Sequence, residues 1–308
     1  MTERPEVVFV GGVAHSGSSL VAGLLDAHPG LAPLPVAAPF HTDDRGLPAL
    51  LAGQLGLEEF AGGFRERWWD GAEGLGDSRD ASVLDAELAR FREAYSRDPL
   101  SACRELFTSL RVPENGAAGV VDTSPGNLRQ AQTLVRLFPE ARFVHVVRDG
   151  RDVAASPASP SPWPSFSRTW SEKLGHTRRV SLAAGIRGWA SRLRELDAAI
   201  RGEEDGTAHP VRADRLAVVV LDWLVDRGGE TAYEELLSRL GLEDDPAMRS
   251  FREVRLRPQD VGRGRWRERA RGPAAWALSH RYRRTLDELA REGNHAANPL
   301  LDAYEELG

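Results

Sequence analysis

The chain has 308 residues, 41% hydrophobic and 28% charged, with a formal net charge of −6. This length suits one large α/β domain or two small ones, and the negative charge argues against a general nucleic-acid binder. The single cysteine, Cys103, excludes an internal disulfide and a cysteine metal site and favours a reducing compartment. Without an apolar signal region or a membrane-length apolar stretch, we expect a cytoplasmic protein with no integral membrane segment.

In chain order, apolar runs and periodicity predict strands that alternate with helices. The predicted strands are 7–10, 119–122, 142–147 and 216–221; the predicted helices are 18–28, most of 54–112 around a loop at 71–80, 127–138, 178–201, 230–240 and the tail from 274. Residues 31–53 and 157–164 are predicted to be irregular loops. This alternation favours a parallel sheet between helical layers. We expect a single domain over 1–308, with helical insertions around 54–112 and 157–201.

A glycine- and hydroxyl-rich loop, residues 11–19, joins the first predicted strand to the first predicted helix. The unpaired N–H groups of a helix N-terminus hold phosphate well. The spacing from Gly12 to Gly17 matches the phosphate-loop motif G-x-x-x-x-G-K-[ST] up to its lysine, where Ser18 stands. We therefore expect a P-loop-like three-layer α/β/α fold, in which the missing lysine disfavours ATP chemistry. A plain strand–helix turn with a serine cap is the alternative.

Two basic segments offer further anion sites. Arg148-Asp149-Gly150-Arg151-Asp152 follows the third predicted strand, at the edge where open α/β sheets bind ligands, and Ser156 is predicted at the start of a helix. Together Arg148 and Ser156 suit a phosphate, although surface salt bridges give the same pattern. The segment 257–269 carries five arginines around Trp266, which indicates a local anion trap or a solvated basic helix start.

These segments together resemble the PAPS-dependent sulfotransferases, in particular a bacterial branch similar to tyrosylprotein and carbohydrate sulfotransferases. PAPS is 3′-phosphoadenosine 5′-phosphosulfate. The family's motif G-x-x-[RK]-S-G-[TS]-[TS]-L, followed by L-x-x-H-P, is matched by 12–20, apart from His15, and by 25–29. The motifs V-x-R-D-[GP]-R-x-x-x-x-S and G-R-W are matched by 146–156 and 264–266, and 122–127 resembles D-K-T-P-x-N with Thr123 for the lysine and Ser124 for the threonine. The resemblance implies PAPS as donor, PAP (the 3′,5′-bisphosphate) as product, and no metal.

The resemblance also implies roles for individual residues. The first loop would bind the 5′-phosphosulfate, Arg148 and Ser156 the 3′-phosphate, and the late motif would close over the nucleotide. The implied nucleotide-binding residues are His15, Ser16, Gly17, Ser18, Ser19, Arg148, Ser156, Arg263, Gly264, Arg265 and Trp266.

Four departures of the chain from the family pattern bear on the site. His15 replaces an arginine or lysine of the first loop, and Thr123 replaces the lysine of D-K-T-P. Val36 stands near where tyrosylprotein sulfotransferases carry a glutamate base. Leu221 stands where many relatives have a tyrosine on the adenine, and neighbouring Trp223 is a candidate replacement.

Sulfuryl transfer requires charge stabilisation at the leaving oxygen and removal of a proton from the acceptor hydroxyl. His15 is the candidate for the first task, because a nearby anion favours its charged form; a structural hydrogen bond is the alternative. Ser250 lies sixteen residues before Trp266, a spacing that resembles a serine assisting the sulfuryl group in tyrosylprotein sulfotransferases. We hypothesise that His41 or Asp43 is the base.

Three questions stay open at this level. The acceptor is a small molecule, a glycan, a lipid or a peptide tyrosine, and residues 37–112 and 157–185 are expected to shape its pocket. Their tryptophans line that pocket or belong to the core: Trp68, Trp69, Trp163 and Trp170. Asp122 is another candidate base. The alternative functions are a non-catalytic PAP- or PAPS-binding module and a P-loop kinase; the oligomeric state is not predicted.

Overall fold

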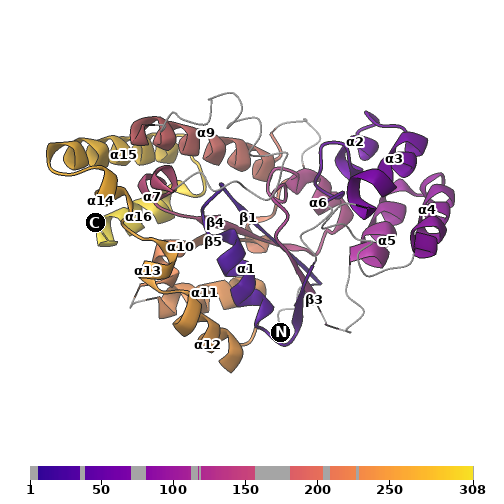
Figure 1. Cartoon of the computed structure of the whole chain (residues 1–308), viewed down its shortest axis with the longest axis horizontal. Coiled ribbons are helices and arrows are strands. Elements are labelled where there is room, and N and C mark those ends of the chain that lie inside the picture. Colours follow the sequence, from indigo (N-terminus) through magenta and orange to yellow (C-terminus); the bar gives the residue numbers. More distant parts are fainter. Residues whose placement is uncertain are drawn as a thin grey trace.

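The computed structural model describes residues 6–34, 39–70, 81–111, 117, 119–156, 181–203, 209–226 and 229–307. Within them, five parallel strands form a sheet of order β2-β3-β1-β4-β5 (Figure 1). Their bounds are β1 (Val7–Gly12), β2 (Leu31–Pro33), β3 (Gly119–Asp122), β4 (Arg142–Val147) and β5 (Leu216–Val220). The four predicted strands are confirmed. The irregular loop predicted over 31–53 is wrong in two places. The short edge strand β2 accommodates Pro33 at its start, and α2 (Leu47–Leu51) forms near its end, where Pro48 suits the first turn of a helix.

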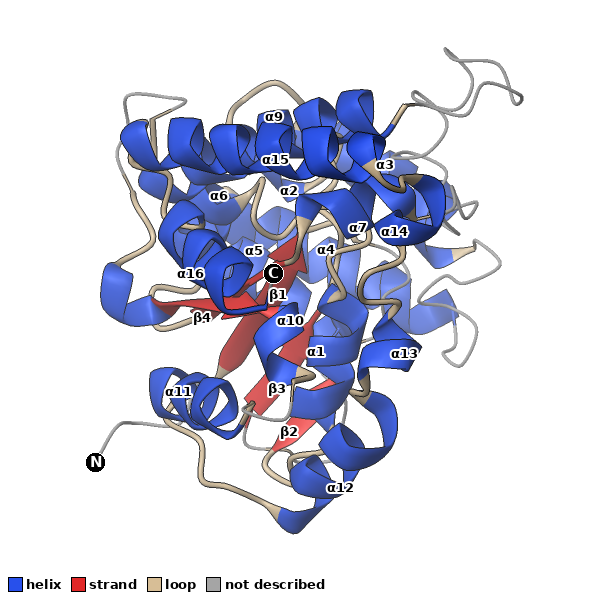
Figure 2. Cartoon of the chain, turned by 90° about the vertical axis from the view of Figure 1, so that its left-hand side faces the viewer, coloured by secondary structure: helices blue, strands red, loops and turns tan. Residues whose placement is uncertain are grey.

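Helices cover both faces of the sheet, which confirms the three-layer α/β/α fold (Figure 2). Side chains alternate along β1, so Val8 and Val10 face one way while Val7 and Phe9 face the other. The first face packs against α1 (Ser18–Asp26), α11 (Glu230–Leu240) and α12 (Pro246–Arg255). The second face packs against α6 (Ala131–Leu137), α9 (Leu182–Arg201), α15 (Pro273–Arg291) and α16 (Ala297–Leu307).

A helical block lies at one end of the molecule (Figure 1). It comprises α2 (Leu47–Leu51), α3 (Leu57–Phe64), a π-helical turn (Arg65–Trp69), α4 (Ala81–Tyr95) and α5 (Pro99–Arg111). Trp68 and Trp69 are each 3% exposed in its core, so they are packing residues in this structure. Cys103 is buried in α5, and burial raises the pKa of its thiol to about 12. The loop predicted at 71–80 lies outside the described residues.

The remaining helix bounds agree with the predictions in type and differ at the ends. Turns occupy 125–130, so α6 begins later than predicted, and residues 178–180 of the predicted helix before α9 are outside the described residues. Short helices near the sheet edge are α7 (Gly150–Ala155), α10 (Leu221–Leu224), α13 (Pro258–Val261) and α14 (Trp266–Arg269). Among the described helices, none has the length and apolarity to span a bilayer.

A series of polar side chains leads from β4 to α9 on the second face of the sheet. His145 of β4 is fully buried, and its Nδ1 lies 2.7 Å from Nε2 of His295. His295 Nδ1 contacts a carboxylate oxygen of Asp197, which also pairs with Arg201 at 2.7 Å. Burial, and then the charge of His295, holds the pKa of His145 well below its usual value. His145 is therefore neutral in the folded chain at neutral pH.

The lowered pKa of His145 predicts that the folded protein becomes less stable as the pH falls. Because folding depresses the pKa of His145, protonation below about pH 6.5 favours the unfolded state, and stability falls as the pH drops. We expect His145 to account for a loss of about 1 kcal/mol in unfolding free energy between pH 6.5 and 5.5. Urea unfolding of His145→Leu should show a correspondingly smaller loss. His280→Ala, which removes an exposed histidine of α15, is the control; an unchanged loss in His145→Leu would contradict the assignment.

Candidate functional site

The candidate site lies at the carboxyl ends of β1 and β4, which are neighbours in the sheet. The chain leaves β1 toward α1 on one face of the sheet and leaves β4 toward α7 on the other. Such a point, where adjacent strands send their connections to opposite faces, is where open α/β sheets form a ligand crevice. The sheet topology alone thus places two of the three predicted anion segments, the first loop and the Arg148 motif, side by side.

The first loop has the tight geometry that its glycines predict. Gly17 has φ 91° and precedes α1, whose N-terminus has no side-chain cap. A Cβ on Gly12 would lie 2.3 Å from the carbonyl oxygen of Val146, and one on Gly17 would lie 2.5 Å from Leu221. Ser16 is 1% exposed, and within the described part of the chain its Oγ has no hydrogen-bond partner. The loop thus combines uncapped helix amides with a buried hydroxyl, as an anion site requires.

His15 occupies the strained position of this loop. It is exposed, and it is the non-glycine residue with positive φ (68°) among the described residues. Desolvation by neighbouring chain, and then the charge of Arg148, lowers the pKa of His15 below its ordinary value. This direction disfavours the charged form that the sequence predicts, because burial penalises the imidazolium and the charge that acts on it, that of Arg148, is a cation rather than an anion.

A bound phosphate or sulfate group would reverse that direction and raise the pKa of His15. We therefore expect proton uptake when PAP binds, with affinity that strengthens as the pH falls and weakens as it rises through the raised pKa. Calorimetry at pH 7 in two buffers of different ionisation enthalpy measures this uptake. His15→Asn should abolish its histidine share, and asparagine tolerates the left-handed backbone better than alanine. Equal uptake in both proteins would exclude protonation of His15.

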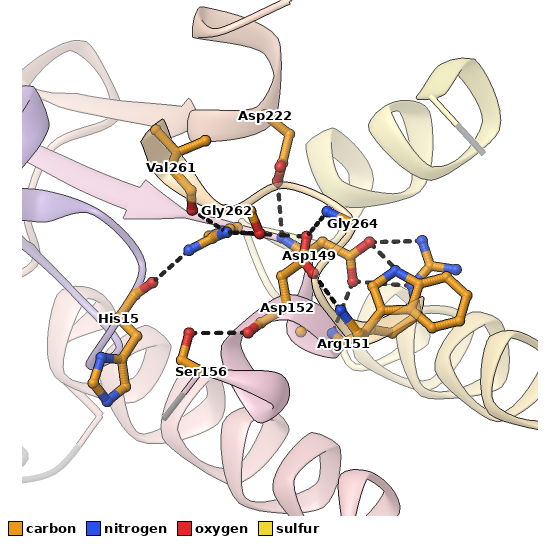
Figure 3. A network of polar contacts seen from close by, with 12 residues as sticks. His15, Asp149, Arg151, Asp152, Ser156, Asp222, Val261, Gly262 and Gly264 are labelled. Carbon is orange, nitrogen blue, oxygen red and sulfur yellow. Dashed lines mark hydrogen bonds and ion pairs between the residues drawn. The ribbon is translucent and has the colours of Figure 1, made fainter. Parts of the chain in front are cut away.

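Arg148 brings all three predicted anion segments together, and Figure 3 shows the residues that accept its hydrogen bonds, His15, Val261 and Gly262. The residue follows β4 and is 6% exposed. Its Nη1 donates to the carbonyl oxygen of His15 at 3.3 Å, and its Nη2 donates to those of Val261 and Gly262 at 2.5 and 2.9 Å. Its buried Nε has no hydrogen-bond partner within the described residues. The guanidinium thus lies between the first loop and the late basic segment.

The second arginine of the motif is not a surface residue. Arg151 is 4% exposed, and its guanidinium makes a two-nitrogen contact with Asp149 at 2.6–3.1 Å. Its charge lies 4.5, 4.9 and 5.0 Å from the ring centres of Trp266, Tyr282 and Tyr304. Cation–π contacts in such a buried cage are stronger than exposed ones. The cage attaches the late segment, α15 and α16 to the Arg148 motif, a role that the sequence did not reveal.

Two buried carboxylates complete the network (Figure 3). Asp152 accepts hydrogen bonds from the backbone N–H groups of Gly264 at 2.7 Å and Trp266 at 3.1 Å. Asp222 of α10 accepts one from the backbone N–H of Asp149 at 3.0 Å, and burial raises the pKa of Asp222 to about 6. Sequence reasoning missed both. The sequence offered little signal for either role, because Asp152 lies in the first turn of α7 and both carboxylates bind backbone N–H groups rather than side chains.

Other predicted nucleotide-binding residues are placed as follows. Ser156 ends α7 instead of starting a helix, and its Oγ donates to the carbonyl oxygen of Asp152 at 3.0 Å. The prediction of a helix start there is wrong because the Asp149 side chain caps the amide of Arg151, so the helix begins at once after the strand. Arg263 pairs with Asp226 at 2.9 Å.

Two tryptophans near the crevice, Trp266 and Trp223, make their contacts within the protein. Trp266 is 3% exposed and packs between the guanidinium groups of Arg151 and Arg267, so in this structure its ring belongs to the core. Trp223 donates its indole N–H to Glu306 of α16 at 2.9 Å. Leu221, at the expected tyrosine position, packs on Gly17 of the first loop. Contact of these side chains with a nucleotide stays a prediction.

Of the two hypothesised bases, His41 is buried and Asp43 is accessible. His41 is fully buried, and its Nε2 lies 2.5 Å from a carboxylate oxygen of Asp122, which is also fully buried. Its ring packs against Phe9 and Phe107. Asp43 is half-buried two residues later and accepts a hydrogen bond from the backbone N–H of Arg45. Of the two hypothesised bases, only Asp43 reaches solvent in this structure.

One other predicted residue, Ser250, is not brought to the crevice. Ser250 is exposed on α12, where the next residue, Phe251, packs against Gly23 in the body of α1. Val36 and two of the four tryptophans, Trp163 and Trp170, lie outside the described residues. Among those that the structure does describe, no group of three or more His, Cys, Asp and Glu side chains is placed to hold a metal ion.

Comparisons with known proteins agree with these motifs. A model of the sulfotransferase family matches residues 5–246. Protein-tyrosine sulfotransferase 2 from Gallus gallus is 28% identical over 148 residues, which cover 47% of this chain and 32% of that protein. The protein-tyrosine sulfotransferase of Drosophila melanogaster is 27% identical over 145 residues, covering 47% of this chain and 23% of that protein. The similarity thus spans a third or less of these relatives' length.

A solved structure shares the fold over nearly the whole chain. The sulfotransferase domain from the Synechococcus PCC 7002 olefin synthase superposes with a TM-score of 0.50 at 19% sequence identity. The superposition covers 94% of this chain and 96% of that one. At this identity the likeness concerns the fold, with its parallel sheet and flanking helices.

Proposed function

Because this chain belongs to the sulfotransferase family, we propose that it transfers a sulfuryl group from PAPS to a hydroxyl of an acceptor: a small molecule, a glycan, a lipid or a peptide tyrosine. The observation that carries the proposal is the position of Arg148, whose guanidinium contacts the first loop at His15 and the late segment at Val261 and Gly262. Three segments that are predicted to bind anions and lie far apart in the sequence therefore meet at one cation.

The residues present fit a donor with two separate anionic groups. The buried Ser16 Oγ and Arg148 Nε have no hydrogen-bond partner within the described residues, and buried polar groups ordinarily have one. The glycines of the first loop keep its backbone open where a Cβ would collide. The first loop would hold the 5′ group of PAPS, and Arg148 with Ser156 the 3′-phosphate. When bound, PAPS supplies the activated sulfuryl group.

The protein's own groups would then perform three tasks. The N–H groups at the start of α1, with the hydroxyls of Ser18 and Ser19, donate hydrogen bonds to anionic oxygens. The imidazolium of His15, formed as its pKa rises beside the anion, donates a proton or a hydrogen bond at the leaving oxygen. A carboxylate at the surface accepts the acceptor's proton, and Asp43 suits this task better than buried His41.

Binding of PAP without magnesium tests the proposal. Calorimetric titration should give tight binding of PAP and weak binding of ATP with magnesium, because Ser18 replaces the lysine that contacts the β and γ phosphates. The reverse order of affinities would support the kinase alternative. A screen with labelled PAPS over phenols, sugars and lipid extracts then separates an enzyme from a binding module, which would bind PAP and label none of them.

The screen also needs a variant that retains PAP binding but lacks the proposed base. Asp43→Asn keeps the size of the side chain and the hydrogen bond from Arg45, so the fold should be unaffected. If Asp43 is the base, turnover falls while PAP affinity stays unchanged. Asp44→Asn, next to it and exposed, is the matched control for loss of one surface charge. Unchanged turnover in Asp43→Asn would remove this residue from the mechanism.

A further inference from the structure

The segment 261–266 is attached to the Arg148 motif at two points. It accepts hydrogen bonds at the first point and donates them at the second. At its start, the carbonyl oxygens of Val261 and Gly262 accept hydrogen bonds from the guanidinium of Arg148. At its end, the backbone N–H groups of Gly264 and Trp266 donate to the two carboxylate oxygens of Asp152. The acid and the arginine are four residues apart, and their charged groups lie 4.0 Å from each other.

The two attachments differ in how they respond to an anion. A phosphate group competes directly with carbonyl oxygens for Arg148, because charge-assisted hydrogen bonds to phosphate are stronger than those to a neutral carbonyl. At Asp152 the acceptor is itself an anion, so a phosphate gains less by replacing it than by replacing a neutral carbonyl oxygen. The first attachment can therefore exchange for a ligand while the second persists.

Burial of the Asp152 carboxylate also costs free energy, because the group loses its hydration. It is 2% exposed, and burial together with the nearby carboxylate of Asp149 raises its pKa. A buried carboxylate is retained where its hydrogen bonds offset the loss of hydration, and here both of its oxygens face one short segment. The glycines at 262 and 264 have φ values of 66° and 75°, so the segment between the attachments follows a path that few other residues adopt.

We infer that Asp152 is a positioning residue for nucleotide binding. It holds the backbone at Gly264 and Trp266 so that the segment stays over the crevice when Arg148 exchanges the carbonyl oxygens of Val261 and Gly262 for a phosphate. Asp152 itself does not touch the nucleotide. This inference rests on the proposed function only in its second readout, PAP affinity; its first readout concerns the segment alone.

The first readout is hydrogen exchange of peptides that cover 262–267, measured by mass spectrometry on the full chain without ligand. In Asp152→Ala the two bonded amides should exchange at least about tenfold faster, because they lose their acceptors. Asp152→Asn keeps one acceptor oxygen and should expose one amide, which also serves if the alanine variant fails to fold. Asp260→Asn, in the same region but exposed and paired with Arg257, is the matched control. Unchanged exchange in both Asp152 variants would overturn the inference.

The second readout is calorimetric PAP binding together with steady-state kinetics. Asp152→Ala should raise the Kd for PAP and the KM for PAPS by about 10- to 30-fold with kcat within about twofold of the wild type. Faster exchange with unchanged PAP affinity would overturn the positioning role, since the segment would then be irrelevant to binding. Absence of PAP binding in the wild type would instead refute the proposed function, and the exchange readout would still decide whether Asp152 holds the segment.

Discussion

Replacement of Arg148 by alanine is expected to weaken PAP binding by about 100- to 1000-fold, the largest effect of any single substitution at the site. The guanidinium is 6% exposed and lies between the first loop and the late segment, with hydrogen bonds to His15, Val261 and Gly262. Its removal takes away the buried cation that would face the 3′-phosphate, together with its hydrogen bonds to three carbonyl oxygens. Isothermal titration with PAP, in a buffer free of magnesium, measures the loss.

Two further variants separate charge from geometry at this position. Arg148→Lys keeps the charge but loses the planar fork, so it should recover only part of the affinity. Arg129→Ala removes an exposed arginine that pairs with Asp44 at 3.1 Å, and it should leave the Kd for PAP within about twofold of the wild type. If Arg148→Ala folds normally and binds PAP with wild-type affinity, the second anion site lies elsewhere and the proposed function loses its main support.

The sheet was predictable from sequence because its central strands are buried on both faces. Runs such as the one in β4 are continuously buried in the structure, and such β-branched stretches have few alternatives to a central strand. The edge strand β2 escaped prediction because three residues ending in Pro33 give neither a run nor a period. Its pairing with β3 uses backbone groups, which leave no side-chain pattern in the sequence.

The site was predictable where the chemistry is local and unpredictable where it depends on tertiary contacts. The first loop and Arg148 are indicated by glycine spacing and by their position directly after strands. The partners of Asp152 lie more than 100 residues away and are backbone amides, which carry no residue-type signal. The cage around Arg151 likewise draws Tyr282 and Tyr304 from the tail, and no spacing rule connects those residues to the motif.

The same distinction applies to His41. Its position in the sequence suggests a catalytic base, whereas its contacts in the folded protein indicate a structural role. The ring is fully buried, packs against Phe9 and Phe107, and pairs with buried Asp122 at the carboxyl end of β3. Asp122 also accepts the backbone N–H of Ser124 at 2.6 Å, and this segment is anchored by Asn127, whose side chain donates to the carbonyl oxygen of Val10 in β1. The pair thus supports the carboxyl end of β3, the neighbour of β1 in the sheet.

We therefore expect His41→Ala to be the most destabilising substitution near the site, at about 3 kcal/mol of unfolding free energy, because it leaves a buried carboxylate without its partner. For a chain of this length the thermal midpoint should fall by about 5 °C, measured by calorimetry. His209→Ala, at an exposed position, should leave the midpoint unchanged. A His41→Ala protein with wild-type stability and PAP affinity but no turnover would show the opposite, that His41 acts on the acceptor; its burial behind Phe9 and Phe107 is the physical reason to expect otherwise.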